Sequence, residues 1–218
     1  LERSAEALAL AEQVGDELLL GEVMSHRFTV MYATFEDPWG CVDLSNRLTE
    51  FADRRGDPGL QLSAAIGLAQ ASMTLCDFRT ADRALERAAA LAEAMEQPAR
   101  EWMVRGWQAM CVAMRGDLEL AETLAMAMLD VGVASDQPDA LTWFAGQLFT
   151  LRLMQGRLAE LTDAVEDEVT SNGAAIPAWR AAYALTLTEA GRLVEAELGS
   201  LAGDELDELL ALLDGEEC

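Results

Sequence analysis

The residue types that most often carry out catalysis are sparse in this chain and stand in no pattern typical of an enzyme. The single histidine, His26, has no second histidine with which to bind a metal or to pass on a proton. The four cysteines, at positions 41, 76, 111 and 218, form no CxxC pair for zinc. Glycine-rich phosphate loops, GxSxG turns and HExxH pairs are also absent from the sequence. We therefore expect no catalytic residue, no cofactor and no metal site.

Structural roles are expected for these few reactive side chains. His26 is predicted to be a partly exposed helix residue, and Cys41, Cys76 and Cys111 to be small buried thiols within helices. Such thiols indicate a reducing cytoplasm. Acidic residues gather at 163–168 and 204–217, but neither cluster has the spacing of a calcium loop, and we interpret both as solvated helix faces. An all-α enzyme using these acids with magnesium is the least favoured functional hypothesis.

Three tryptophans and two arginines recur at matched positions before a glycine. Trp102, Trp143 and Trp179 lie 12 to 14 residues before Gly116, Gly156 and Gly191, and Arg105 and Arg180 lie 11 residues before the first and last of these glycines. Gln147 and Arg152 add polar side chains in the intervening segment. On one shared face these residues would form an aromatic ladder with hydrogen-bond donors along a partner-binding groove. The alternatives are interhelical packing of the tryptophans and neutralisation of the arginines by nearby acids.

Charge and hydropathy restrict the possible partners. The chain has 15 basic and 39 acidic residues, a net charge of −24 and a pI of about 4.1. Direct binding to nucleic acid or to an anionic membrane surface is therefore disfavoured, and a basic or apolar partner fits better. No apolar run reaches the ~20 residues of a membrane span, and the N-terminus lacks the order of a signal peptide.

Helix-breaking residues recur at regular intervals and indicate the elements that carry these side chains. Pro58, Pro98, Pro138 and Pro177 are 40, 40 and 39 residues apart, and a second set of breaks, at Cys76-Asp77, Gly116-Asp117 and Gly156-Arg157, lies halfway between them. The predicted helices are 1–15, 17–35, 39–55, 59–76, 79–96, 98–115, 118–134, 138–155, 158–171, 177–190, 193–202 and 204–214. Each pair of helices forms one repeat.

The apolar residues inside these helices follow a helical period. Met103, Trp107, Met110, Cys111 and Met114 form one predicted buried stripe, and Ala81, Ala84, Leu85, Ala88, Leu91, Ala92 and Met95 form another. A lone helix pair cannot bury its apolar face, so neighbouring pairs must stack. We predict an all-α fold of about 12 helices, a right-handed superhelix (α-solenoid) of antiparallel hairpins.

The whole chain, 1–218, is predicted to be a single helical-repeat domain. Its repeat units are about 17–57, 58–97, 98–137, 138–176 and 177–203, and helix 1–15 is a leftover half repeat. Because the chain begins at Leu1 with amphipathic sequence, we expect it to be a fragment of a longer protein.

The sequence resembles the tetratricopeptide superfamily. A small residue follows five residues after each Gly-Asp-like turn, as at Ala81, Ala121 and Ala196, although the ~40-residue spacing is longer than usual for that family. Residues 138–200 are also similar to the C-terminal repeats of large actinobacterial regulators, which join a signalling ATPase to an adenylate/guanylate cyclase or a LuxR-type domain. No counterpart of those ATPase or output domains is present in the sequence.

These resemblances imply a non-catalytic interaction or regulatory module. We expect its concave groove to bind a peptide, a partner helix or a neighbouring domain of the parent protein, in the cytoplasm, without direct contact to nucleic acid or membrane. A small-molecule sensor with a closed pocket is the alternative, and a homodimer is possible in either case.

Overall fold

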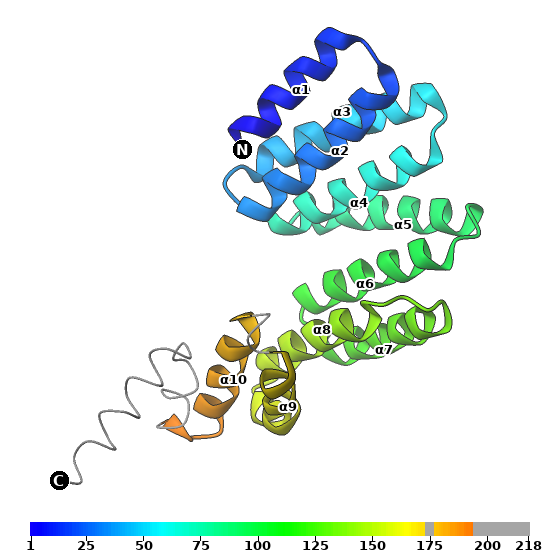
Figure 1. Ribbon diagram of the computed structural model, residues 1–218. Coiled ribbons are helices and arrows are strands. Elements are labelled where there is room, and N and C mark those ends of the chain that lie inside the picture. The colour runs from blue at the N-terminus through cyan, green and yellow to red at the C-terminus, as the bar shows by residue number, and fades with distance from the viewer. Residues whose placement is uncertain (173–176, 194–218) are drawn as a thin grey trace, which may run out of the picture. The chain divides into compact units, whose positions relative to one another are not determined.

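The computed structural model describes residues 1–172 and 177–193 of the chain, and this part is all-helical (Figure 1). The elements are α1 (Glu2–Val14), α2 (Glu17–Thr34), α3 (Pro38–Arg55), α4 (Pro58–Thr74), α5 (Phe78–Ala94), α6 (Pro98–Met114), α7 (Leu118–Ala134), α8 (Ala140–Met154), the 3-10 turn η1 (Leu158–Leu161), α9 (Thr162–Asn172) and α10 (Pro177–Glu189). The all-α prediction is confirmed. In the described part, no helix combines the length and hydropathy that a membrane crossing requires.

The predicted helix ends agree closely with the observed ones. Both ends lie within two residues for α1 to α8 and for α10. The segment predicted as one helix over 158–171 instead begins with the tight turn η1 before α9 starts at Thr162. Pro138 was expected to open a helix but lies in the preceding turn, two residues before Ala140. The last two predicted helices, 193–202 and 204–214, lie almost wholly outside the described residues.

Left-handed residues end the helices at almost constant intervals. From the start of the chain to α8 they are Gly15, Phe35, Gly56, Cys76, Glu96, Gly116, Asp136 and Gly156, and Gly191 follows after a longer step. Glycine adopts this conformation without steric strain, whereas in other residues the β-carbon comes too close to the backbone and makes it less favourable. Cys76, with φ of 57°, is therefore an exposed helix-ending residue, and its prediction as a buried helical thiol was wrong. At four of the breaks, Phe35, Cys76, Glu96 and Asp136, a residue other than glycine takes the left-handed conformation.

Aspartates cap most of the helices that follow these breaks. Asp16, Asp37, Asp57, Asp77 and Asp117 each accept a hydrogen bond from a backbone N–H of the next helical turn. The hydroxyl and the backbone N–H of Thr80 donate to Asp77 and lower the pKa of that carboxyl. Each bond satisfies one of the donors that a helix start leaves free, which makes every break a definite boundary.

The N-cap of α6 lacks such a bond, and we predict that it can be improved. Gln97 precedes α6 in an extended conformation but makes no side-chain cap hydrogen bond. Asparagine reaches the next turn without adding charge, so Gln97→Asn should stabilise the protein by about 0.5 to 1 kcal/mol. Asp57→Ala, at a working cap, should destabilise it by about 1 kcal/mol. Urea unfolding followed by circular dichroism measures both, and shifts of the same sign would contradict the capping argument.

The even-numbered helices lie side by side in the N-terminal part of the chain. Consecutive helices pack against each other along the series from α1 to α7, and α2 contacts α4 while α4 contacts α6 (Figure 1). The small residues expected at the contacts are fully buried at Ala81 and Ala121, whereas Ala196 lies outside the described residues. On α5, five of the seven residues in the predicted stripe are buried, so that stripe is largely confirmed. The even helices therefore share one surface.

The chain comprises two compact units, residues 1–147 and 148–218, and the boundary falls inside α8. In the second unit, which is described up to residue 193, α9 packs against α10 and both contact η1. The predicted repeat boundaries and the single domain over 1–218 stay predictions.

Candidate functional site

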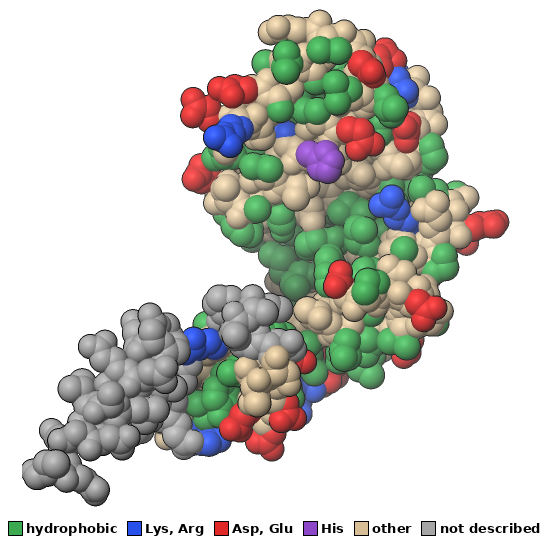
Figure 2. Space-filling view, in the orientation of Figure 1, with side chains coloured by type: hydrophobic (Ala, Val, Ile, Leu, Met, Phe, Trp, Pro, Cys, Tyr) green, Lys and Arg blue, Asp and Glu red, His purple; other side chains and the backbone are tan. Residues whose placement is uncertain are grey.

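A groove of about 340 Å³ lies on the surface that the even helices form in the first unit. We call it the aromatic groove. Its lining residues are Ser25, Phe28 and Thr29 of α2, Ser45 and Leu48 of α3, Leu62, Ser63, Ile66 and Gln70 of α4, Arg100, Met103 and Trp107 of α6, and Trp143 of α8. Figure 2 shows hydrophobic side chains gathered in a recess beside the part of the surface that carries His26. The lining contains no Asp or Glu, although the chain is strongly acidic.

Helix α6 contributes one side of the groove through residues spaced along a single face. Arg100, Met103 and Trp107 stand at i, i+3 and i+7, which places them above one another on a helix. Met103 and Trp107 were predicted to belong to a buried stripe that ran on to Met114. They instead line the groove and are partly exposed, and Met114 is 41% exposed. The stripe is therefore only partly confirmed: Cys111 is buried, and Met103 and Trp107 pack against core clusters on one side while they border the groove on the other.

A chain of aromatic contacts connects three of the even helices. The Phe28 and Tyr32 rings of α2 are stacked with centroids 5.7 Å apart, and Tyr32 meets Trp107 edge-on at 6.5 Å. Trp107 in turn meets Trp143 of α8 edge-on at 6.0 Å. Burial raises the pKa of the Tyr32 phenol, and its hydrogen bond with Thr74 offsets part of that effect. These edge-on and stacked arrangements hold the groove wall in one geometry.

Ser45 and Arg100 are among the groove residues whose side chains have no hydrogen-bonding partner among the described residues. The Ser45 hydroxyl is buried, with 1% of the residue exposed, and neither donates nor accepts a hydrogen bond there. The Arg100 side chain is partly buried and forms no ion pair or hydrogen bond within the same part of the chain. Buried polar groups in proteins are normally satisfied, so the Ser45 hydroxyl retains unused hydrogen-bonding capacity beside the groove.

Three of the seven predicted site residues, Trp102, Trp143 and Gln147, lie close together in the structure. Only Trp143 lines the groove, and it is 37% exposed. Trp102 is buried, with its ring 5.2 Å from that of Trp143. Gln147 is also buried, and its Nε2 donates to the carbonyl oxygen of Gly106 at 2.9 Å. Trp102 and Gln147 support the wall of the groove from behind.

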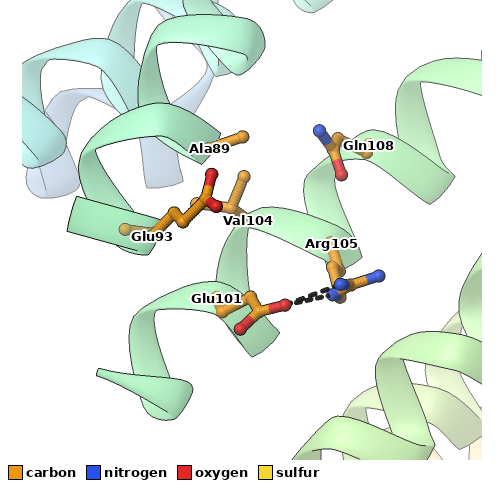
Figure 3. Close-up of a pocket in the computed structure, with 7 residues that line it drawn as sticks. Ala89, Glu93, Glu101, Val104, Arg105 and Gln108 are labelled. Carbon is orange, nitrogen blue, oxygen red and sulfur yellow. Dashed lines mark hydrogen bonds and ion pairs between the residues drawn. The ribbon is translucent and has the colours of Figure 1, made fainter. Parts of the chain in front are cut away.

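Arg105 lies on a different face of α6, where it lines a second pocket of about 470 Å³ between α5 and α6 (Figure 3). Its Nη2 donates to Glu101 Oε1 at 2.6 Å, while Glu93 and Gln108 border the same pocket. The ion pair is internal to α6 and leaves Arg105 already neutralised, as the alternative interpretation of the arginines expected.

The other three predicted residues belong to the second unit. Arg152 donates to Gln155 Oε1 at 2.7 Å and lies 3.7 Å from Glu160 Oε2. Trp179 and Arg180 lie on α10 and are half-buried. A continuous ladder of Trp102, Trp143 and Trp179, and a partner-binding role for the seven residues, stay predictions.

Sequence reasoning missed Phe28, Ser45 and Arg100. A signal was present for Arg100, because its spacing from Met103 and Trp107 adds a cation to a recognisable apolar face. Ser45 carried no such signal, since a single serine within a helix reveals nothing about its neighbours in space.

The reactive side chains show no catalytic grouping in the described part. Burial raises the pKa of the Cys41 and Cys111 thiols, which disfavours the thiolate. His26 is largely exposed and lies 4.0 Å from Glu22. Among the residues that the structure covers, no group of three or more His, Cys, Asp and Glu side chains could hold a metal ion.

Comparison with solved structures identifies the architecture. No protein-family model and no curated protein matches the sequence. Two similar structures come from Podosopora anserina, a protein described as a kinesin light chain with nearly identical TPR-like repeats and a point variant of it. Each has a TM-score of 0.50 and 14% sequence identity, over 100% of this chain and 96% of the other. At this identity the likeness concerns the fold alone, which is a TPR-like array of helical hairpins.

Proposed function

We propose that this chain is a protein-interaction module whose aromatic groove binds a peptide or helical segment of a partner. The observation that carries the proposal is the groove itself, an apolar recess lined by aromatic rings and bordered by serine, threonine and glutamine side chains. Burial of apolar side chains of the partner against Phe28, Trp107 and Trp143 would supply affinity. Because packed helices hold these rings before binding, little conformational freedom is lost on association.

The wider context follows from the resemblance of residues 138–200 to actinobacterial regulators. We propose that the module serves a bacterial signalling or transcriptional regulator in the cytoplasm, and that the partner segment belongs to another protein or to another domain of the same regulator. A coding sequence that joins these repeats to neither a signalling ATPase nor a cyclase or DNA-binding domain would contradict this part.

A small-molecule sensor is the second candidate, and the size of the groove favours it. A volume of about 340 Å³ falls at the lower end of the range typical of small-ligand sites, and the unpaired Ser45 hydroxyl offers an orienting hydrogen bond. Because Trp107 and Trp143 line the groove, their fluorescence should respond to an occupant. A metabolite that shifts tryptophan emission and raises the unfolding temperature would favour this candidate over peptide binding.

Peptide binding can be tested by selecting ligands from a random dodecapeptide display library on the immobilised full chain. We expect enriched peptides whose affinity, measured by fluorescence anisotropy, falls by about tenfold or more in Thr29→Trp, because an indole at this exposed lining position would obstruct the groove. Glu50→Trp adds the same indole on the exposed face of α3, outside the groove, and should leave affinity unchanged. Absence of enriched peptides, or equal loss in both variants, would contradict the proposal.

A further inference from the structure

We propose that the aromatic groove selects partner segments that present a carboxylate next to apolar side chains, and that Arg100 binds this carboxylate. The inference rests on the proposed peptide-binding function and specifies the chemistry of the partner. It reverses the expectation from overall composition, since a chain with a net charge of −24 would be expected to prefer a basic partner.

The local charge of the groove is opposite in sign to that of the whole protein. None of its lining residues is acidic, and Arg100 is the one charged side chain among them. A basic side chain entering the groove would meet this guanidinium and no neutralising carboxylate. An acidic side chain would instead form an ion pair, so the groove discriminates by repulsion as well as by attraction.

Among the partly buried arginines of the first unit, Arg27, Arg87 and Arg105 use their side chains in hydrogen bonds, whereas Arg100 forms none with a described residue. Other arginines of the first unit form ion pairs, namely Arg47 with Glu12, Arg55 with Glu17, Arg87 with Asp53, Arg105 with Glu101 and Arg115 with Asp82. Arg100 is therefore the one partly buried arginine of the first unit that makes no side-chain hydrogen bond with a described residue. A guanidinium offers a carboxylate two parallel hydrogen bonds, which is the strongest form of this interaction.

The position of Arg100 on α6 sets the order of groups in the partner. Met103 and Trp107 continue the same helix face from Arg100 towards the aromatic contacts with Tyr32 and Trp143. A segment along this face would place its carboxylate at Arg100 and its apolar side chains against the sulfur and indole beyond it. The partner is therefore expected to carry aspartate or glutamate within a few residues of aromatic or aliphatic side chains.

The buried hydroxyl of Ser45 is an independent sign that the groove receives a polar group. Ser45 lines the groove from α3, is almost completely buried and has no hydrogen-bond partner within the described residues. A backbone carbonyl or amide of a bound peptide could satisfy it. A ligand with both apolar side chains and an amide backbone matches this combination better than a purely apolar one.

The decisive experiment uses the peptides selected on the full chain from the same display library. We expect Asp or Glu to be enriched at one position beside aromatic or aliphatic residues. Changing that acid to its amide should weaken binding by about tenfold in the unmodified protein and have little effect in Arg100→Gln. Arg79→Gln removes an exposed arginine outside the groove and serves as the matched control, with unchanged affinity. Circular dichroism melts check that both variants are folded.

The outcomes separate this inference from the function on which it rests. Peptides that lose affinity in Thr29→Trp but contain no enriched acid, or bind Arg100→Gln as well as the unmodified protein, would overturn the carboxylate preference and leave groove binding intact. Enrichment of Lys or Arg would overturn it as well, in favour of a basic partner. If no peptide is selected, or if binding ignores Thr29→Trp, the proposed function fails together with the inference.

Discussion

Replacement of Trp102 by alanine is expected to destabilise the protein by about 3 to 5 kcal/mol, the usual cost of removing a buried indole. Trp102 is 7% exposed and forms a core cluster with Met128 of α7 and Ala140 of α8. Its ring also packs against Trp143, which lines the groove. Alanine would leave a cavity where α6, α7 and α8 meet. Urea unfolding monitored by circular dichroism measures the free energy of unfolding.

Trp102→Phe provides the matched control for this prediction. The Trp102 Nε1 makes no hydrogen bond within the described part of the chain, so phenylalanine loses no such bond and fills much of the same space. Its cost should be well under half that of alanine. If alanine and phenylalanine cost the same, or if Trp102→Ala costs less than about 1 kcal/mol, then Trp102 is not the core residue described above.

Addition of a single methyl group at Gly132 should be destabilising although alanine is the better helix former. A β-carbon at this position of α7 would lie 2.6 Å from the Cβ of Ala140 and 2.7 Å from Trp102 Nε1. Ala140 has no flexible side chain to move aside, so the helices themselves must shift. Overpacking costs about 1 to 3 kcal/mol, which exceeds the gain of up to about 1 kcal/mol in helix propensity. We expect Gly132→Ala to reduce the free energy of unfolding by about 1 to 2 kcal/mol.

Gly146→Ala should have the opposite sign. Gly146 also lies within a helix, but among the described residues a β-carbon there would meet no atom within 4 Å apart from its chain neighbours and the backbone of its own helix. Only the helix propensity changes, and the protein should gain about 0.5 to 1 kcal/mol. Thermal and urea unfolding of the two variants, side by side, separates close helix contact from propensity. Stabilisation by both substitutions would show that α7 does not approach Trp102 and Ala140 this closely.

Helix α6 contributes side chains to the core, to the pocket beside α5 and to the groove, because these side chains point in different directions around the helix axis. Trp102 packs into the core, Arg105 faces the pocket beside α5, and Arg100, Met103 and Trp107 face the groove. Successive residues on a helix are turned by about 100° from each other, so neighbours in sequence serve different surfaces. A change at Trp102 is therefore expected to act on stability, and a change at Arg100 on binding.

The helix boundaries could be predicted from the chain because each is set by local chemistry. A left-handed residue followed by an aspartate or proline ends one helix and begins the next, whatever lies around it in space. The regular recurrence of these breaks then implies hairpins that must stack to bury their apolar residues. The α5 stripe was correct for the same reason, since a helix with one strongly apolar face has only one way to bury it.

The members of the groove could not be assigned in this way, because α6 is apolar on several sides and its periodicity favours no single one. Packing against α7 and α8 buried Trp102, while Met103 and Trp107 lie beside an opening, the reverse of the expected arrangement. Ser45 and Phe28 joined the site from helices that are distant along the chain. Short-range chemistry is encoded in neighbouring residues and determines where helices start and stop. Contacts between helices depend on how all the faces fit together, and this fit alone placed Arg100 in a groove without acidic neighbours.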